Sequence, residues 1–184
     1  MSDFINTLDL IDDEVLCGSI IDKTITEFRD NVIEKVGEYA FVRCKNLTVL
    51  DVPNVTNLRG RCCQGCSSLV ELNIPKVSRL DDATFFGTSS LKKVDLPLVT
   101  SINKENFYNS TSLETLILRH NGRVSLGNVN AFTNTPIANG TGYIFNMNDG
   151  VSTSIKEIPN VSAIYAYDER LYVQATKVHR YGFG

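Results

Sequence analysis

Residues Asn57–Ile102 read NLRGRCCQGCSSLVELNIPKVSRLDDATFFGTSSLKKVDLPLVTSI, and this stretch contains one pattern written twice. The pattern recurs every 22 residues and continues on both sides of the stretch. Aligned columns of apolar residues make the period visible: Leu47, Leu69, Leu91 and Leu113; Leu50, Leu72, Val94 and Leu116; Val52, Ile74, Leu96 and Leu118; Phe41, Cys63, Phe85 and Phe107. A constant period of this length predicts a solenoid, in which each repeat forms one coil and stacks on its neighbours.

The repeating unit has the form LxxLxLPxVTxLxxxAFxxCxS, and each part of it predicts a piece of the coil. The alternating LxL segment suits a short strand whose inward side chains pack on the coils above and below. Proline ends this strand, because it has no N–H group to donate to a continuing ladder. A second extended piece, VTxL, follows, and we expect the AFxxC segment to close the coil as a short helical turn.

The two ends of the repeat array should carry caps, because a coil without a neighbour leaves its apolar face in water. Residues 2–18 have apolar side chains at helical spacing, so we expect residues 1–24 to form an acidic helical cap. We assign the solenoid to residues 25–145. Residues 146–184 should form a β-rich C-terminal cap, since the alternation over 164–173 predicts a hairpin, and this segment is a candidate anchor or oligomerisation element.

The composition is that of an ordinary globular protein, with 42% hydrophobic and 21% charged residues in a chain of 184. The net charge of −3 argues against a nucleic-acid-binding protein, which would carry a strongly basic surface. The first residues lack the basic start and the apolar core of a signal peptide, and no apolar run approaches the length that crosses a bilayer. We therefore expect a protein made in the cytoplasm, with neither a membrane nor a nucleic acid as its partner.

Charge is unevenly distributed along the chain. Residues 1–36 carry nine acidic and three basic side chains, whereas residues 59–80 carry four basic side chains and one acidic one. An acidic end beside a basic repeat would give the molecule a docking polarity. A solvated face explains the same charges more simply, and both interpretations stay open.

Five cysteines are present, and without a secretion signal they are expected to be thiols. The sequence Cys62-Cys63-x-x-Cys66, together with Cys44, has the spacing of a four-thiolate zinc site. Each of these residues also fills an inward column of the repeat, where a buried cysteine packs as a small hydrophobic residue. We favour packing over zinc binding and expect neither a metal nor a cofactor.

Polar residues recur at outward positions near the predicted strands and form a candidate binding surface. One column consists of Asp51, Asn73 and Asp95; a second contains Thr48, Lys92 and Glu114; the basic repeat adds Arg59, Arg61 and Arg79. Such a polar strip could bind sugar hydroxyls or calcium, and ordinary solvated strand faces explain it too. No catalytic residue is predicted, because neither His120 nor His179 has a sequence neighbour that suggests a triad or a metal pair.

The segment VGEYAF at 36–41, with Cys44, Leu47, Leu50, Val52-Pro53 and Val55-Thr56, recurs as far as Leu118. In these columns the chain resembles the BspA-like, or Treponema-type, leucine-rich repeat family over about residues 20–145. The resemblance implies an α/β repeat, a leucine-rich-repeat solenoid of short strands and short helical turns. The ending SLETLILRHNGRVSLGNVNAFTNTPIANGTGYIF is similar to the closing segment of short members encoded in Gram-positive phages and prophages. Those relatives usually continue with a helical stretch, which residues 146–184 replace here.

The resemblance implies a non-enzymatic recognition or structural module, since family members are bacterial surface adhesins and occur among tail, fibre and baseplate genes in phages. We predict a virion accessory protein of a tail, baseplate or head fibre, which binds a host surface ligand or cements virion parts. Its partners would be other virion or surface proteins, a host polysaccharide or protein, or a second copy of the chain. The alternative is a bacterial leucine-rich-repeat protein-interaction or adhesin-like module.

Overall fold

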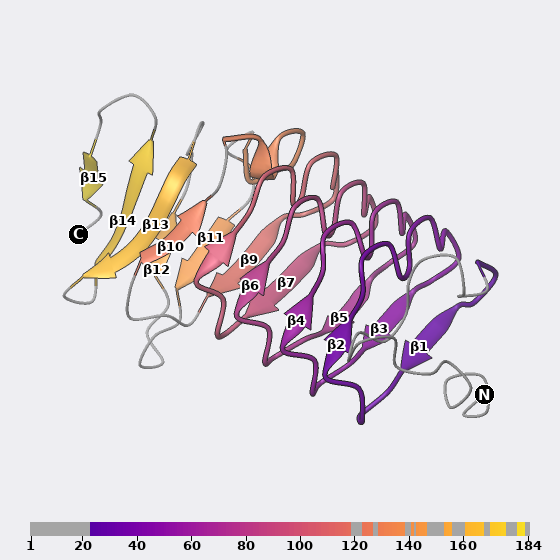
Figure 1. Ribbon diagram of the computed structural model, residues 1–184. Coiled ribbons are helices and arrows are strands. Elements are labelled where there is room, and N and C mark those ends of the chain that lie inside the picture. The colour runs from indigo at the N-terminus through magenta and orange to yellow at the C-terminus, as the bar shows by residue number, and fades with distance from the viewer. Residues whose placement is uncertain are drawn as a thin grey trace.

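The computed structural model describes residues 23–118, 123–126, 129–138, 141, 143–146, 153–155, 161–167, 170–175 and 180–182. These residues form a stack of coils that advances along one axis (Figure 1). The solenoid predicted from the repeat is therefore confirmed. The helix predicted over residues 2–18 lies outside the described residues. Within the described residues, no helix has the length and apolar character needed to span a membrane.

The first strand of each coil lies on one side of the stack, where successive strands pair in parallel (Figure 1). The pairing steps by one repeat, so that Phe28 lies opposite Leu50 and Leu50 lies opposite Leu72. One sheet of three strands contains β1 (Glu27–Arg29), β3 (Val49–Asp51) and β5 (Glu71–Asn73). A sheet of four strands continues the row with β7 (Lys93–Leu96), β9 (Thr115–Leu118), β11 (Tyr143–Asn146) and β12 (Thr153–Ile155).

The second extended piece of each coil builds another sheet, of eight strands. Its parallel part contains β2 (Lys35–Val36), β4 (Asn57–Leu58), β6 (Arg79–Leu80), β8 (Ser101–Ile102) and β10 (Arg123–Leu126). Beyond β10 the pairing becomes antiparallel, through β13 (Val161–Tyr167), β14 (Arg170–Ala175) and β15 (Arg180–Gly182). The strands β13 and β14 pair across Tyr167 and Arg170, in the stretch where the alternation predicts a hairpin.

The segment that closes each coil is a series of turns, so the predicted short helical turns are wrong for the coils between residues 36 and 110. The Phe41 N–H donates to the Cys62 carbonyl of the next coil at 2.7 Å, whereas the Val42 N–H donates back to the Tyr39 carbonyl at 3.0 Å. Because the turns of successive coils are hydrogen-bonded to each other, they stack as closely as paired strands, at about 4.8 Å, and an α-helix about 10 Å wide would not fit there on every coil. A 3₁₀ helix, η1 (Val129–Phe132), follows the last of these coils.

Each turn segment places backbone in the left-handed region at two points. One column of such residues is Tyr39, Arg61, Ala83 and Glu105, and the other is Arg43, Gly65, Gly87, Asn109 and Asn134. Glycine and asparagine adopt this conformation at little cost, which explains most of the second column. The second column reaches Asn134 after a step of 25 residues instead of 22, whereas the first column ends at Glu105, because Asn130 lies in a 3₁₀ helix and has no positive φ.

The core is a continuous column of side chains enclosed by the two strand sides and the turns. The rings of Phe85 and Phe107 stack at 5.6 Å between centroids, and Phe107 stacks on Phe132 at 5.5 Å. Phe28 meets Phe41 edge to face at 4.8 Å. Cys63 takes the position between Phe41 and Phe85 and is fully buried, as its column predicts. The aromatic stack is thus interrupted in the coil that holds the cysteine cluster.

Candidate functional site

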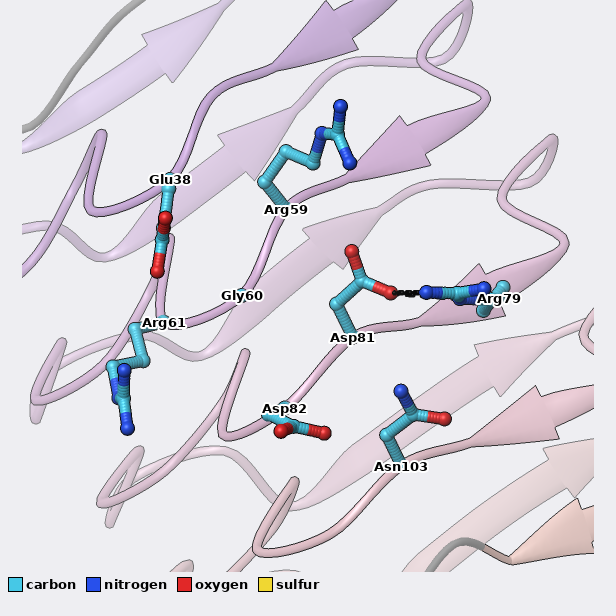
Figure 2. A pocket seen from close by; sticks show the side chains of 8 residues that line it. All are labelled: Glu38, Arg59, Gly60, Arg61, Arg79, Asp81, Asp82 and Asn103. Atoms are coloured by element: carbon cyan, nitrogen blue, oxygen red, sulfur yellow. Dashed lines mark hydrogen bonds and ion pairs between the residues drawn. The ribbon is translucent and has the colours of Figure 1, made fainter.

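The nine residues of the predicted binding surface fall on two separate parts of the solenoid. Asp51, Asn73 and Asp95 lie on the strands β3, β5 and β7, on the side of the stack that holds the first strand of each coil. Arg59, Arg61 and Arg79 lie on or after the strands of the eight-stranded sheet. They line a depression there (Figure 2). The nine residues therefore do not form one continuous surface, and the two parts have different chemistry.

The outward side chains of β3, β5 and β7 make up what we call the strand face. Here the Asn73 side-chain amide donates to the Asp51 carboxylate at 2.8 Å, and the Arg29 guanidinium lies 3.3 Å from the same carboxylate. Hydrogen bonding to Glu27 is the main cause that raises the pKa of the exposed Arg29; desolvation opposes it, and the charge of Glu27 and the hydrogen bond and charge of Asp51 add to the rise. The column is thus a row of paired polar groups that runs across successive coils.

The second predicted column, Thr48, Lys92 and Glu114, lies immediately before the strands rather than within them. The Thr48 N–H donates to the Thr26 carbonyl at 2.7 Å, which joins two coils through the backbone. Side chains alternate along a strand, so the residues that share the strand face with Asp51, Asn73 and Asp95 are two positions earlier in each strand. They are Val49, Glu71 and Lys93, continued by Thr115 on β9, and the sequence reasoning missed them.

The depression beside the arginines has a volume of about 500 Å³. Sequence reasoning identified Arg59, Arg61 and Arg79 in its lining. It missed Glu38, Gly60, Asp81, Asp82 and Asn103, which come from the same coil and its neighbours. A signal was present, because Glu38, Gly60, Asp82 and Lys104 form one column at the repeat period, and a glycine there leaves a gap between two acidic side chains.

The basic surface expected over residues 59–80 is balanced by acids of neighbouring coils. Asp81 lies 2.6 Å from the Arg79 guanidinium, and the Asp82 carboxylate lies 3.5 Å from the Lys104 ammonium. Arg61 instead donates to the Tyr39 hydroxyl at 2.9 Å, and its guanidinium carbon lies 5.8 Å from the centre of the Tyr39 ring. With three arginines and three carboxylates in its lining, the depression has no net formal charge.

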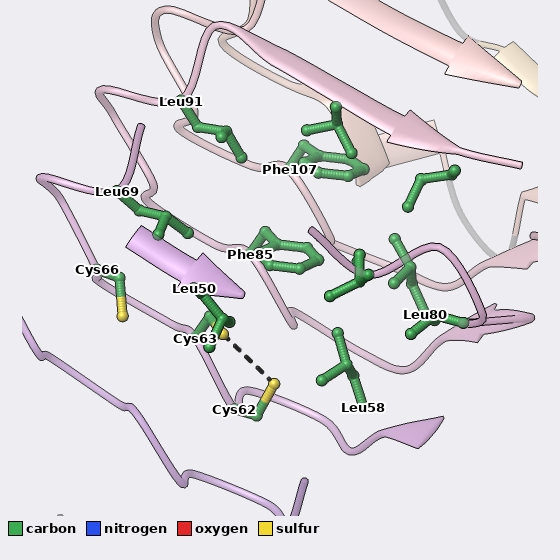
Figure 3. Close-up of a cluster of buried hydrophobic side chains, with 14 of the residues drawn as sticks. Leu50, Leu58, Cys62, Cys63, Cys66, Leu69, Leu80, Phe85, Leu91 and Phe107 are labelled. Atoms are coloured by element: carbon green, nitrogen blue, oxygen red, sulfur yellow. Dashed lines mark hydrogen bonds between the residues drawn. The ribbon is translucent and has the colours of Figure 1, made fainter. Parts of the chain in front are cut away.

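The cysteine cluster lies in the core beneath the same coil (Figure 3). Cys44, Cys62, Cys63 and Cys66 are thiols with no exposed surface. The sulfurs of Cys62 and Cys63 are 3.6 Å apart, and the Cys66 thiol donates to the Phe41 carbonyl at 3.0 Å. Hydrogen bonding to Cys62 and then to Cys66, followed by burial, raises the pKa of the Cys63 thiol well above its ordinary value of 9.0.

A raised thiol pKa is the reverse of what a cysteine nucleophile needs, because the nucleophile is the thiolate. The column of Cys44 and Cys66 continues with Thr88, Ser110 and Thr135. Thr88 donates to the Phe85 carbonyl at 2.9 Å, so the column supplies hydrogen-bond donors to turn carbonyls whether its atom is sulfur or oxygen. Within the part of the chain that the structure describes, no three His, Cys, Asp or Glu side chains are grouped so as to hold a metal ion.

Comparison with known proteins agrees with this geometry. The family model described as BspA type leucine rich repeat region matches residues 10–141 in six copies. No curated protein and no solved structure matches the chain. The match covers more than half of the 184 residues and includes every coil built on the 22-residue period. The chain therefore belongs to the BspA-type leucine-rich repeat family.

Proposed function

We propose that the chain is a non-enzymatic recognition module of the protein-interaction or adhesin-like kind, which binds a partner through the strand face. The observation that carries this proposal is the strict register of the strands. Successive coils place Asp51 opposite Asn73 and Asp95 opposite Ile117, and the inward residue Leu50 opposite Leu72. Outward side chains are thereby held in rows about 4.8 Å apart on a preformed surface.

A preformed surface suits recognition because little conformational entropy is lost when a partner binds. The side chains that support the strand face, Leu50 and Val94 among them, are almost completely buried, so the outward rows rest on a packed core. The rows mix acids, amides and bases, as in Glu71, Asn73 and Lys93. This composition favours a polar macromolecule as the partner, and the family assignment supports a module of this kind.

The proposal of a non-enzymatic role rests on the chemistry of the described side chains. The thiol with the raised pKa, that of Cys63, is sealed in the core and cannot reach a substrate. In the depression Arg79 is paired with Asp81, and Asp82 lies near Lys104. Neither arrangement provides a nucleophile activated by a base.

Binding of a fluorescently labelled chain to intact cells, isolated cell walls and purified virions of the source organism tests the proposed function. We expect saturable binding to at least one of these, weakened at least tenfold when Glu71→Lys and Lys93→Glu are combined on the strand face. The control is Val32→Ser, at a side chain that is 78% exposed and lies away from the strand face. Absence of saturable binding would refute the proposal. An equal loss of binding in the control would show that the strand face is not the binding surface.

The virion setting is a finer proposal, and it is supported by the similarity of the closing segment to short phage-encoded members of the family. In that setting the chain would sit on a tail, baseplate or head fibre and bind a host surface ligand or join virion parts. Mass spectrometry of purified virions from the source organism tests it. Peptides of this chain at a constant ratio to a tail protein are expected, and virions without them would exclude the setting while leaving the recognition module in place.

A further inference from the structure

The depression next to Gly60 exists because a side chain is missing from a regular column. Glu38, Gly60, Asp82 and Lys104 occupy equivalent positions in four successive coils. Figure 2 shows Gly60 between the side chains of Glu38 and Asp82. Unlike Gly65 and Gly87, Gly60 does not have a positive φ, so the turn does not require glycine at this position. Because glycine has no side chain, the space above position 60 stays open.

At the floor of this space, a side chain at position 60 would meet the backbone of the next coil. A Cβ atom on Gly60 would lie 3.2 Å from the Asp82 carbonyl oxygen, closer than ordinary van der Waals contact. The floor of the hollow is therefore backbone, and its walls are the charged side chains of the coils on either side. We call this feature the Gly60 hollow, bounded by Glu38, Arg61, Asp82 and Asn103.

Two groups at the Gly60 hollow keep hydrogen-bonding capacity that the described protein does not use. The Glu38 carboxylate forms no ion pair or hydrogen bond with any residue that the structure describes. The Arg61 guanidinium has the Tyr39 hydroxyl as its hydrogen-bond acceptor and pairs with no carboxylate among the described residues. By contrast, Asp81 is held by Arg79 and Asp82 lies near Lys104, so these form a fixed wall.

An acceptor and a donor side by side, with a polar lining of no net charge, match the chemistry of a sugar. Neighbouring hydroxyl groups can donate to a carboxylate and accept from a guanidinium at the same time. A polyanion would meet three carboxylates, and an apolar ligand would find a lining of charged and amide groups. The volume of about 500 Å³ falls within the range of about 300–1,000 Å³ that is usual for small-ligand sites.

We propose that the Gly60 hollow binds one saccharide unit of a surface glycan, with Glu38 accepting hydrogen bonds from the sugar hydroxyls and Arg61 donating to them. The contact between Arg61 and Tyr39 holds the guanidinium in place before the sugar arrives, which lowers the entropy lost on binding. This proposal rests on the proposed recognition function but uses a different surface from the strand face. The two can therefore fail independently.

Saturation-transfer NMR with the full chain and the methyl glycosides of glucose, galactose, N-acetylglucosamine and glucuronate tests the proposal. We expect saturable millimolar binding of at least one glycoside. Glu38→Gln and Arg61→Met should each weaken it at least tenfold. Glu34→Gln, the same substitution at an exposed carboxylate outside both the hollow and the strand face, should leave the affinity within twofold. Circular dichroism and the urea midpoint of each variant check that the fold is retained.

Three results would overturn the proposal: no glycoside binds, binding is unchanged in both Glu38→Gln and Arg61→Met, or only a zwitterionic probe such as glycylglycine binds. Gly60→Val offers a second route, because it fills the hollow without changing a charge, and it should abolish glycoside binding. If labelled chain binds cells but no glycoside binds the hollow, the saccharide site is refuted and the recognition module stands. Glycoside binding without cell binding would refute the strand-face function alone.

Discussion

Phe85→Ala is the substitution that tests the packing of the solenoid most sharply. The Phe85 ring has no exposed surface and stacks on Phe107 with the two planes 6° apart. Removing it takes away the burial of an aromatic side chain, which contributes about 2–3 kcal/mol. A residual cavity of about 80 Å³ adds about 2 kcal/mol at about 24 cal/mol per Å³. Since neighbouring coils will close part of the cavity, we expect the free energy of unfolding to fall by about 3–5 kcal/mol.

Phe86→Ala is the matched control, because it is the same substitution at the next residue. The Phe86 ring stacks on Tyr108 at 5.1 Å, but it lies on the outside of the turn and is only partly buried. Its loss should lower the free energy of unfolding by about 1 kcal/mol, the value of an exposed aromatic pair. Urea unfolding followed by circular dichroism gives both free energies, from the midpoint and the slope. A difference of less than about 1 kcal/mol between the variants would refute the inward assignment of the Phe85 column.

Three further predictions concern the turns, the thiols and an exposed ion pair. Gly87→Ala should lower the free energy of unfolding by about 1 kcal/mol, because Gly87 has a φ of 71° and alanine is strained there. Gly87→Asn should lower it less, because asparagine tolerates a positive φ. Equal losses in urea unfolding would show that backbone strain is not the cause. The folded protein keeps the Cys63 thiol protonated above its ordinary pKa of 9.0, so stability is fully present below that pH and falls as the pH rises beyond it. Urea unfolding between pH 7 and 10.5 should show this decline, and Cys63→Ala should reduce it; an unchanged slope in the variant would contradict the assignment. Arg29→Ala should leave the urea midpoint almost unchanged, since the pair of Arg29 with Asp51 is exposed and screened, and a clear fall in the midpoint would show that the pair is more than a surface contact.

The sequence predicts the buried positions and the strands well, because each coil must bury apolar side chains at the same places and the apolar residues therefore repeat with the period of the coil. Leu47, Leu69 and Leu91 recur every 22 residues, and all three are fully buried. The strand predicted around Leu50 is β3, and it pairs with the equivalent strands of the coils on either side. Repeat spacing is sufficient for these assignments, since stacked coils must place equivalent residues next to each other.

The conformation of the turns and the composition of the depression could not be predicted from the apolar pattern. The AFxxC segment has the spacing of a helical turn, yet its N–H groups donate to the turn of the next coil instead of closing a helix, and residues such as Tyr39 and Ala83 are left-handed. The Thr48 column was expected in the same binding surface as Asp51, whereas Thr48 lies one residue before the strand. The sequence did not predict that the charge around Arg61 is neutralised, because the acidic side chains that line the depression belong to neighbouring coils.

Amide hydrogen exchange of the native protein, followed by NMR, tests the central claim that the coils are joined on every side, turns included. The N–H groups of Phe41, Cys63 and Phe85 lie in turns but donate to carbonyls of the next coil at 2.7, 3.0 and 3.1 Å. We predict that these amides exchange as slowly as that of Leu50 in β3 and far more slowly than that of Leu98, which lies in an exposed turn. Exchange of all three at the rate of Leu98 would contradict the stacked solenoid and the ordered surfaces that depend on it.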